Sequence, residues 1–413
     1  MRSHLQIALT ITSCCLAGLT AACSHEDSTV TATPDAHASV ALGTWNEDSA
    51  TAYLDQRAAW WVQWKGAARD HGTFCVSCHT TVPYILSQPA IHAGPGAPDI
   101  SANERLILDD VTKRVRLWKD VEPYYSNSWY GAPNAVGSRG TESILNALIL
   151  SVYSEQTGHL TDDTRAAFAN LWALQLTSGA GKGAWPWQQF HLQPWEAADS
   201  GYYGAALAAI AVGTAPDNYQ STPAIQNNLK LLREYLLRDY TSEPLLNQTF
   251  LLLASAKLPQ LLTPSQQKSI ADQLFAVQRP DGGWSLSRLS GPWYGWNYIS
   301  ALAMLNLRRD RTPRETKSDG DATAMVTYAM QQSGIPRENP QLQRGLAWLV
   351  ANQSQIDGSW PAYSLNRKRD LSTNIGRFMS DEATAYAVLA LTQRGAQSSP
   401  PAVSQAGQAP PSP

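Results

Sequence analysis

The sequence predicts an all-α fold, an (α/α)6 toroid (barrel) of inner and outer helices. Three observations support this prediction. Segments rich in small apolar residues recur at intervals of about 60 residues, longer amphipathic segments lie between them, and helix-capping residues open many segments of both kinds. One helix pair cannot bury its apolar face alone, so six pairs are expected to stack into a single repeat domain. Length alone would suggest two or three domains for 413 residues.

The N-terminal residues predict export. Residues 1–22 have the charged start, short apolar core and small-residue exit of a signal peptide of the lipoprotein type. The ending Leu19-Thr20-Ala21-Ala22-Cys23 resembles a bacterial lipobox, which implies lipidation of Cys23 and a membrane anchor. Thr20 departs from the usual leucine, so plain secretion stays open. The expected location is the periplasmic side of a bacterial membrane, lipid-anchored or soluble.

Residues 23–43 are polar and are expected to form a flexible tether, and the toroid is expected to span residues 44–394. Its first outer helix is predicted at 49–69 and the second from about 102. Later outer helices are predicted to begin at Thr161, Thr222-Pro223, Thr263-Pro264 and Asn339-Pro340. Thr and Asn are favoured at the N-cap, and proline is favoured as the first helical residue.

Inner helices are predicted where an acid precedes small apolar residues and a glycine ends the segment. These segments run from Glu142 to Gly158, Asp199 to Gly213, Asp321 to Gly334 and Asp381 to Gly395. Two further inner helices are predicted, one starting near Cys78 and one at 245–257 that lacks the acid. An insertion at about 285–318 lies in the fifth pair, and residues 395–413, rich in Pro and Ser, are expected to form a disordered tail.

Composition excludes some classes of function. Lys and Arg total 31 against 34 Asp and Glu, so no basic surplus exists to neutralise phosphates and no nucleic-acid partner is expected. Five cysteines are too few for a disulfide-built scaffold.

A recurring glutamine and tryptophan pattern follows the outer helices. It reads Gln278 to Trp284 and Gln353 to Trp360, with a looser copy from Gln175 to Trp185. The glutamine is expected to bond the start of the next element, while the indole covers the helix end and donates its single N–H. The pattern resembles the glutamine–tryptophan motif of the terpenoid cyclase and protein prenyltransferase superfamily, which includes the squalene–hopene cyclases.

That resemblance implies an aspartate proton donor in a DxDD motif. The best match is Asp319-Gly320-Asp321-Ala322, in which Asp321 takes the donor position but alanine replaces the last aspartate. Asp321 is therefore a candidate catalytic acid only if the chemistry is cyclase-like. The simpler interpretation of Asp321 is an acid at a helix N-terminus.

The segment Cys75-Val76-Ser77-Cys78-His79 matches the CxxCH attachment motif of c-type cytochromes. The match implies haem c bound by thioethers to Cys75 and Cys78, with His79 as the proximal iron ligand and His92 as a tentative sixth ligand. A Cys75–Cys78 disulfide and half of a metal site are the open alternatives.

These observations favour an exported toroid that carries one haem and acts in electron transfer or haem-dependent redox chemistry, with a redox partner protein. The alternatives are a terpene cyclase-like isomerase or lyase acting on an apolar, isoprenoid molecule through Asp321, and a non-catalytic binding scaffold of the envelope. Whether the protein is an enzyme is left open.

Overall fold

The computed structural model describes residues 43–93, 100–126, 131–190, 194–197, 200–291, 317–366 and 368–392. The predicted signal peptide, Cys23, most of the tether and the tail from 395 lie outside these ranges. Within them the chain consists of helices joined by loops, two of the longest at 174–190 and 352–366, with one isolated bridge between Ala68 and Phe74. No described helix combines the length and apolar character that crossing a bilayer requires.

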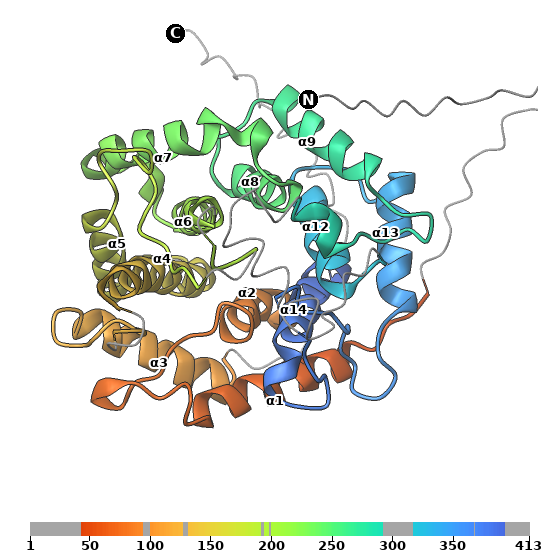
Figure 1. Cartoon of the computed structure of the whole chain (residues 1–413), viewed down its shortest axis with the longest axis horizontal. Helices are drawn as coiled ribbons and strands as arrows, with labels where there is room; N and C mark the ends of the chain where they lie inside the picture. The colour runs from red at the N-terminus through yellow and green to blue at the C-terminus, as the bar shows by residue number, and fades with distance from the viewer. Residues whose placement is uncertain are drawn as a thin grey trace, which may run out of the picture. The chain divides into compact units, whose positions relative to one another are not determined.

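The described helices form two concentric rings, as Figure 1 shows. The outer ring contains α1 (Glu47–Gln63), α3 (Ala102–Arg116), α5 (Asp162–Ala173), α7 (Gln226–Arg238), α9 (Pro264–Ala276) and α13 (Pro340–Ala351). The inner ring contains α2 (Thr81–His92), α4 (Gly131–Thr157), α6 (Gly201–Thr214), α8 (Leu245–Lys257), α12 (Gly320–Gln332) and α14 (Phe378–Thr392). Each inner helix packs on the next, and α14 packs on α2, so the inner ring closes. The all-α (α/α)6 toroid is confirmed.

Small residues allow the inner helices to pack on all sides. Helix α6 reads GYYGAALAAIAVGT and is buried along almost its whole length. At Gly204 an added Cβ would lie 2.3 Å from the ring of Trp187, so only glycine permits this approach. The outer helix α7 has polar residues on its outer face and buries Leu229, Leu232 and Leu236 against the inner ring.

The glutamine and tryptophan pairs form the predicted contacts. Gln278 donates through Nε2 to the carbonyls of Gly282 and of Gln341 at the start of α13, at 2.8 and 2.7 Å. Trp284 donates from Nε1 to the Leu274 carbonyl of α9 at 2.7 Å. Each pair thus ties the end of one outer helix to the start of the next element.

The last pair closes the ring. Gln353 donates to the carbonyl of Asn46, the N-cap of α1, at 2.8 Å and accepts from the Asn46 backbone N–H at 2.7 Å. Trp360 donates to the Leu349 carbonyl of α13 at 2.7 Å. The sixth repeat is therefore bonded directly to the first.

Some predicted helix starts are wrong. Helix α4 begins at Gly131, so Glu142 lies well inside it rather than at its start. Helix α2 begins at Thr81, and Cys75 to His79 form the loop that leads into it. The insertion contains the short α10 (Leu286–Leu289), while residues 292–316 lie outside the described ranges, as do Asp199 and Gly395.

Candidate functional site

A cavity of about 230 Å³ opens beside the loop that precedes α2 and the first residues of α14. Cys75, Cys78 and His79 line one side of it, and Trp195, Glu196 and Met379 are among the other lining residues. Two stretches far apart in the sequence meet here because α14 packs on α2.

His79 is held in the cavity wall by a buried carboxylate. Its Nδ1 lies 2.6 Å from Oε2 of Glu382 on α14, and its Nε2 lies 3.9 Å from Oε1 of Glu196. Burial alone would lower the pKa of His79, but the carboxylates of Glu382 and Glu196 outweigh it and raise that pKa to about 10. The imidazole is therefore a cation at neutral pH, and Glu382 fixes its orientation.

Three cavity-lining polar atoms are buried without a hydrogen-bond partner among the described residues. They are Nε2 of Gln188, Nε1 of Trp195 and the hydroxyl of Tyr124. Such atoms are rare in folded proteins because each forfeits its hydration without replacement. The cavity therefore offers hydrogen-bonding groups to an oxygen-rich ligand.

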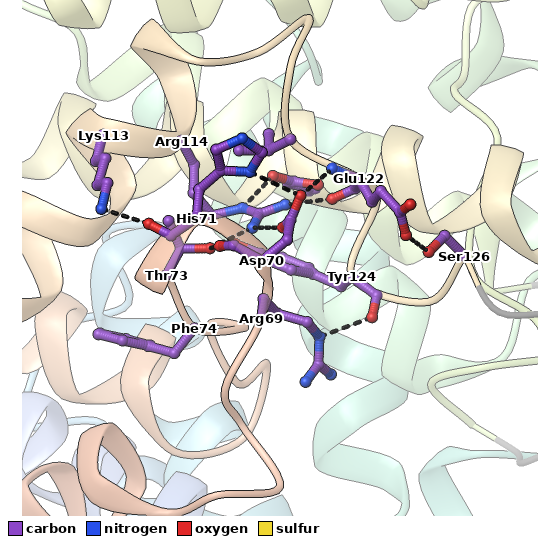
Figure 2. A network of polar contacts seen from close by, with 12 residues as sticks. Arg69, Asp70, His71, Thr73, Phe74, Lys113, Arg114, Glu122, Tyr124 and Ser126 are labelled. Atoms are coloured by element: carbon purple, nitrogen blue, oxygen red, sulfur yellow. Dashed lines mark hydrogen bonds and ion pairs between the residues drawn. The ribbon is translucent and has the colours of Figure 1, made fainter.

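A buried arginine, Arg114, joins the segment around Thr73 to the segment around Glu122, as Figure 2 shows. Arg114 of α3 donates to Oε1 of Glu142 and to the hydroxyl of Thr73, each at 2.6 Å, and also to the carbonyl of Glu122. Thr73 stands just before Cys75, and Glu122 just before Tyr124. Trp61 adds a bond from Nε1 to the Cys75 carbonyl at 2.6 Å. The loop that carries the two cysteines is therefore tied to α1, α3 and α4.

The two thiols are free in this structure. Burial raises the pKa of Cys75 to about 12 and that of Cys78 well above its usual range. Both sulfurs are therefore protonated at neutral pH, which argues against either one as a catalytic nucleophile.

Asp321 is buried in the first turn of α12, whose N-cap is Asp319. Both carboxylate oxygens of Asp321 are buried without a hydrogen-bond partner in the part of the chain that the structure describes, as is Oε1 of Glu382. Burial, followed by the nearby charges of Glu382 and Asp319, raises the pKa of Asp321 well above its usual range. The surroundings of Asp321 therefore favour its neutral, protonated form. It is not among the residues that line the cavity.

Two other inner-helix acids, Asp381 and Glu142, have arginine partners. Asp381 of α14 accepts two bonds from Arg57 of α1, at 2.6 and 2.9 Å, and Glu142 pairs with Arg114. Carboxylates buried and paired in this way hold the helices together, whereas Asp321 has no arginine partner among the described residues.

The structure brings Cys75, Cys78 and His79 to one cavity but does not bring His92 there. His92 is the last residue of α2, whose 12 residues span about 18 Å, and its Nε2 lies 3.2 Å from Glu104. Met379, in the first turn of α14, lines the same cavity as His79.

Sequence reasoning missed Glu382, Glu196 and Gln188. Glu382 directly follows the predicted helix-start acid Asp381, and this doubled acid is unlike the single acids of the other repeats. Glu196 and Gln188 lie in the Trp-rich segment after Trp185, where no periodic signal indicates which side chains face inward.

No family model matches the chain, and no curated protein sequence matches it. Similar solved structures include a glycosyl hydrolase of family 88 from Bacteroides vulgatus, at 12% identity and a TM-score of 0.47, covering 84% of this chain and 99% of that one. A possible GH105 member from Klebsiella pneumoniae has 12% identity and a TM-score of 0.44, covering 88% of this chain and 96% of that one. A polysaccharide lyase, BACCELL_00875, has 12% identity and a TM-score of 0.32, covering 84% and 88%.

These comparisons correct the expected function. The structures found are named as a glycosyl hydrolase, a possible GH105 member and a polysaccharide lyase, and not as cytochromes or terpene cyclases. The expectation of haem-dependent electron transfer or redox chemistry is therefore wrong, and so is that of squalene cyclase-like chemistry through Asp321. Attachment of haem c to Cys75 and Cys78 is not tested by these comparisons and stays a prediction; it competes with any acid–base role of His79, because His79 would then hold the iron. Both thiols and His79 line one cavity, and a pyridine haemochrome spectrum of the exported protein tests the attachment.

Proposed function

We propose that this protein is an enzyme that cleaves a saccharide in the cavity beside His79, using acid–base chemistry. The observation that carries the proposal is the arrangement of His79, held by Glu382 on one ring nitrogen and facing Glu196 with the other. A cation that donates a proton and a carboxylate that accepts one thus lie side by side in a ligand-sized space.

The cavity lining supports a saccharide as the ligand. The unpartnered groups of Gln188, Trp195 and Tyr124 suit a molecule with many hydroxyl or carboxylate oxygens. Aromatic residues, including Tyr125 and Phe190, also line the space and offer apolar surface for the C–H faces of sugar rings.

The proposed step gives each residue one role. His79 donates its Nε2 proton to the glycosidic oxygen as the C–O bond breaks, and Glu196 accepts a proton. Retaining and inverting glycosidases separate their two carboxyl groups by about 5–5.5 and 6.5–9.5 Å. Those separations apply to two carboxyl groups, whereas His79 and Glu196 form an imidazolium–carboxylate pair with 3.9 Å between Nε2 and Oε1, so the proposed reaction is elimination rather than hydrolysis.

In elimination, Glu196 removes the proton of a carbon adjacent to a carboxylate. The electron pair of that C–H bond forms a C=C bond as the leaving oxygen takes the proton from His79. The proposed substrate therefore contains a uronic acid, whose carboxylate makes that C–H bond acidic.

The test is a panel of neutral and uronic acid-containing polysaccharides, followed by the ultraviolet absorbance of the new double bond and by reducing ends. We expect product from polyuronates, and a loss of about 100-fold or more in His79→Gln and Glu196→Gln. His159→Gln, which changes an exposed histidine, is the matched control. Reducing ends without the absorbance would indicate hydrolysis and overturn the elimination. Absence of product from every polymer, or full activity in His79→Gln, would overturn the proposal.

We also propose that the protein acts outside the cytoplasm, anchored through a lipid on Cys23. The lipobox-like ending at Cys23 supports this. Mass spectrometry of the mature N-terminus, with Cys23→Ser as the control, tests it. A mature chain that begins elsewhere would contradict the lipid anchor.

The likeness to the terpenoid cyclase and prenyltransferase superfamily is proposed for architecture alone. The three glutamine and tryptophan pairs support it, since Trp185, Trp284 and Trp360 all donate to carbonyls of the preceding outer helix.

A further inference from the structure

A second cavity, of about 270 Å³, lies toward the C-terminal ends of the inner helices. All six inner helices supply its walls, with Leu86, Leu148, Leu207, Leu253, Tyr328 and Leu389 contributed by α2, α4, α6, α8, α12 and α14 in turn. The first cavity instead lies beside the loop before α2 and the start of α14, so the two occupy different parts of the inner ring.

A connected series of aromatic rings lies between the two cavities. Trp195, which lines the first cavity, has its ring centroid 5.0 Å from that of Tyr203. Tyr203 contacts Phe250 at 4.6 Å, and Phe250 lies 6.3 Å from Tyr386, which lines the second cavity. All four rings belong to buried residues, so they separate the second cavity from the acid–base site.

The charges of the second cavity cancel. Among its described lining residues, Glu155 and Lys257 are charged, and Nζ of Lys257 lies 3.2 Å from Oε1 of Glu155. A charged ligand would lose hydration on entry without finding a free counter-charge. Thr214 and Gln332 add polar groups that suit a hydroxyl or carbonyl.

We propose that this second cavity is a binding site for an uncharged apolar molecule that carries a single hydroxyl or carbonyl group. The leucines contact the apolar part, and the polar residues hold its oxygen. Apolar burial supplies most of the affinity, so an alkyl chain is the simplest suitable probe.

Octan-1-ol, octanoate and octylamine share one chain and differ in the head group, so calorimetric titration of the full-length protein compares them directly. We expect saturable binding of octan-1-ol, and binding about tenfold or more weaker for the two charged probes. Tightest binding by octanoate or octylamine would overturn the uncharged class, and no saturable binding of octan-1-ol would overturn the site.

Two substitutions that fill the cavity locate the binding. Leu389→Trp and Leu207→Phe should weaken octan-1-ol binding by about tenfold or more, because the added ring occupies the ligand's space. Leu106→Phe, on the exposed surface of α3, should leave it unchanged. Unchanged binding in both folded cavity variants would overturn the location.

If neither variant folds, methyl NMR of the unmodified protein decides. The methyl signals of Leu389 and Leu207 should shift with octan-1-ol while those of Leu106 stay in place. Shifts confined to Leu145, which lines the first cavity, would overturn the proposal.

Discussion

Nδ1 of His79 lies 2.6 Å from Oε2 of Glu382, although 303 residues separate them in the chain. Helix α14 packs on α2 as the ring closes, and this contact creates the pair. The same closure brings Arg57 to Asp381 and Gln353 to Asn46. The candidate acid–base site is thus built at the seam where the last repeat meets the first.

Glu382→Gln is predicted to lower the pKa of His79 from about 10 toward its ordinary value of 6.5, because the amide removes the charge that stabilises the imidazolium. In the unmodified protein this pair contributes stability that is fully present below pH 6.5 and lost as the pH rises through about 10. An NMR titration of the His79 ring and unfolding curves across that pH range check both statements. An unaltered His79 titration in the variant would contradict the assignment.

Asp321→Asn is predicted to stabilise the protein at pH 8 and to have little effect at pH 4. The pKa of Asp321 is higher in the folded than in the unfolded protein. The contribution of Asp321 to the free energy of unfolding is therefore largest at low pH and is lost as the pH rises above 3.8, the pKa in the unfolded protein. An amide avoids this loss, which amounts to about 1.4 kcal/mol for each pKa unit. Thermal unfolding at the two pH values measures the difference. Equal effects at both would show that Asp321 is ionised in the fold.

Arg114→Met is predicted to destabilise the protein by about 3–5 kcal/mol, because it leaves the buried Glu142 carboxylate without its main partner. Adding Glu142→Leu should recover most of that loss. Arg116→Met breaks an ion pair with Asp163 in which the arginine side chain is 68% exposed and the charges are screened by water, so it should cost far less than Arg114→Met. Urea unfolding of the four proteins tests the contrast, and similar values for Arg114→Met and Arg116→Met would refute it.

Gln353→Ala is predicted to destabilise the toroid by about 2–4 kcal/mol through the loss of its bonds to Asn46 and Gly358. Gln278→Ala removes the equivalent bonds inside the ring and serves as the matched control. Hydrogen exchange should show faster opening of α1 in Gln353→Ala only. Unchanged α1 protection would mean that this pair does not close the ring.

Gln188→Met is predicted to raise the melting temperature of the ligand-free protein slightly while weakening saccharide binding. The Nε2 group of Gln188 is buried without a partner, so its removal relieves a desolvation penalty that only a ligand offsets. Calorimetry with a bound oligosaccharide and without it separates the two effects. Lower stability without ligand would contradict this reading of Gln188.

The sequence alone predicts much of this fold because its signals are local. The signals are the capped start at Thr263-Pro264, the apolar spacing of 245–257, and the bonds from Gln278 to Gly282 and from Trp284 to Leu274, all of which join residues close together in the chain. The CxxCH motif at residues 75–79 can likewise be read from consecutive residues. The predicted start of α4 at Glu142 is wrong because the sequence pattern does not distinguish an acid inside a helix from an acid at its first turn.

The tertiary structure decided which groups meet. Closure of the ring places Glu382 beside His79, where it stabilises the protonated imidazole, and places Glu196 opposite the other ring nitrogen. His92 lies at the far end of α2, away from that cavity. The contrast between Asp381, paired with Arg57, and Asp321, buried with no partner, also depends on contacts between helices far apart in the chain. Helix capping and apolar periodicity are local properties, so they can be predicted from the sequence. Burial and charge pairing depend on packing between distant segments, which only the folded ring determines.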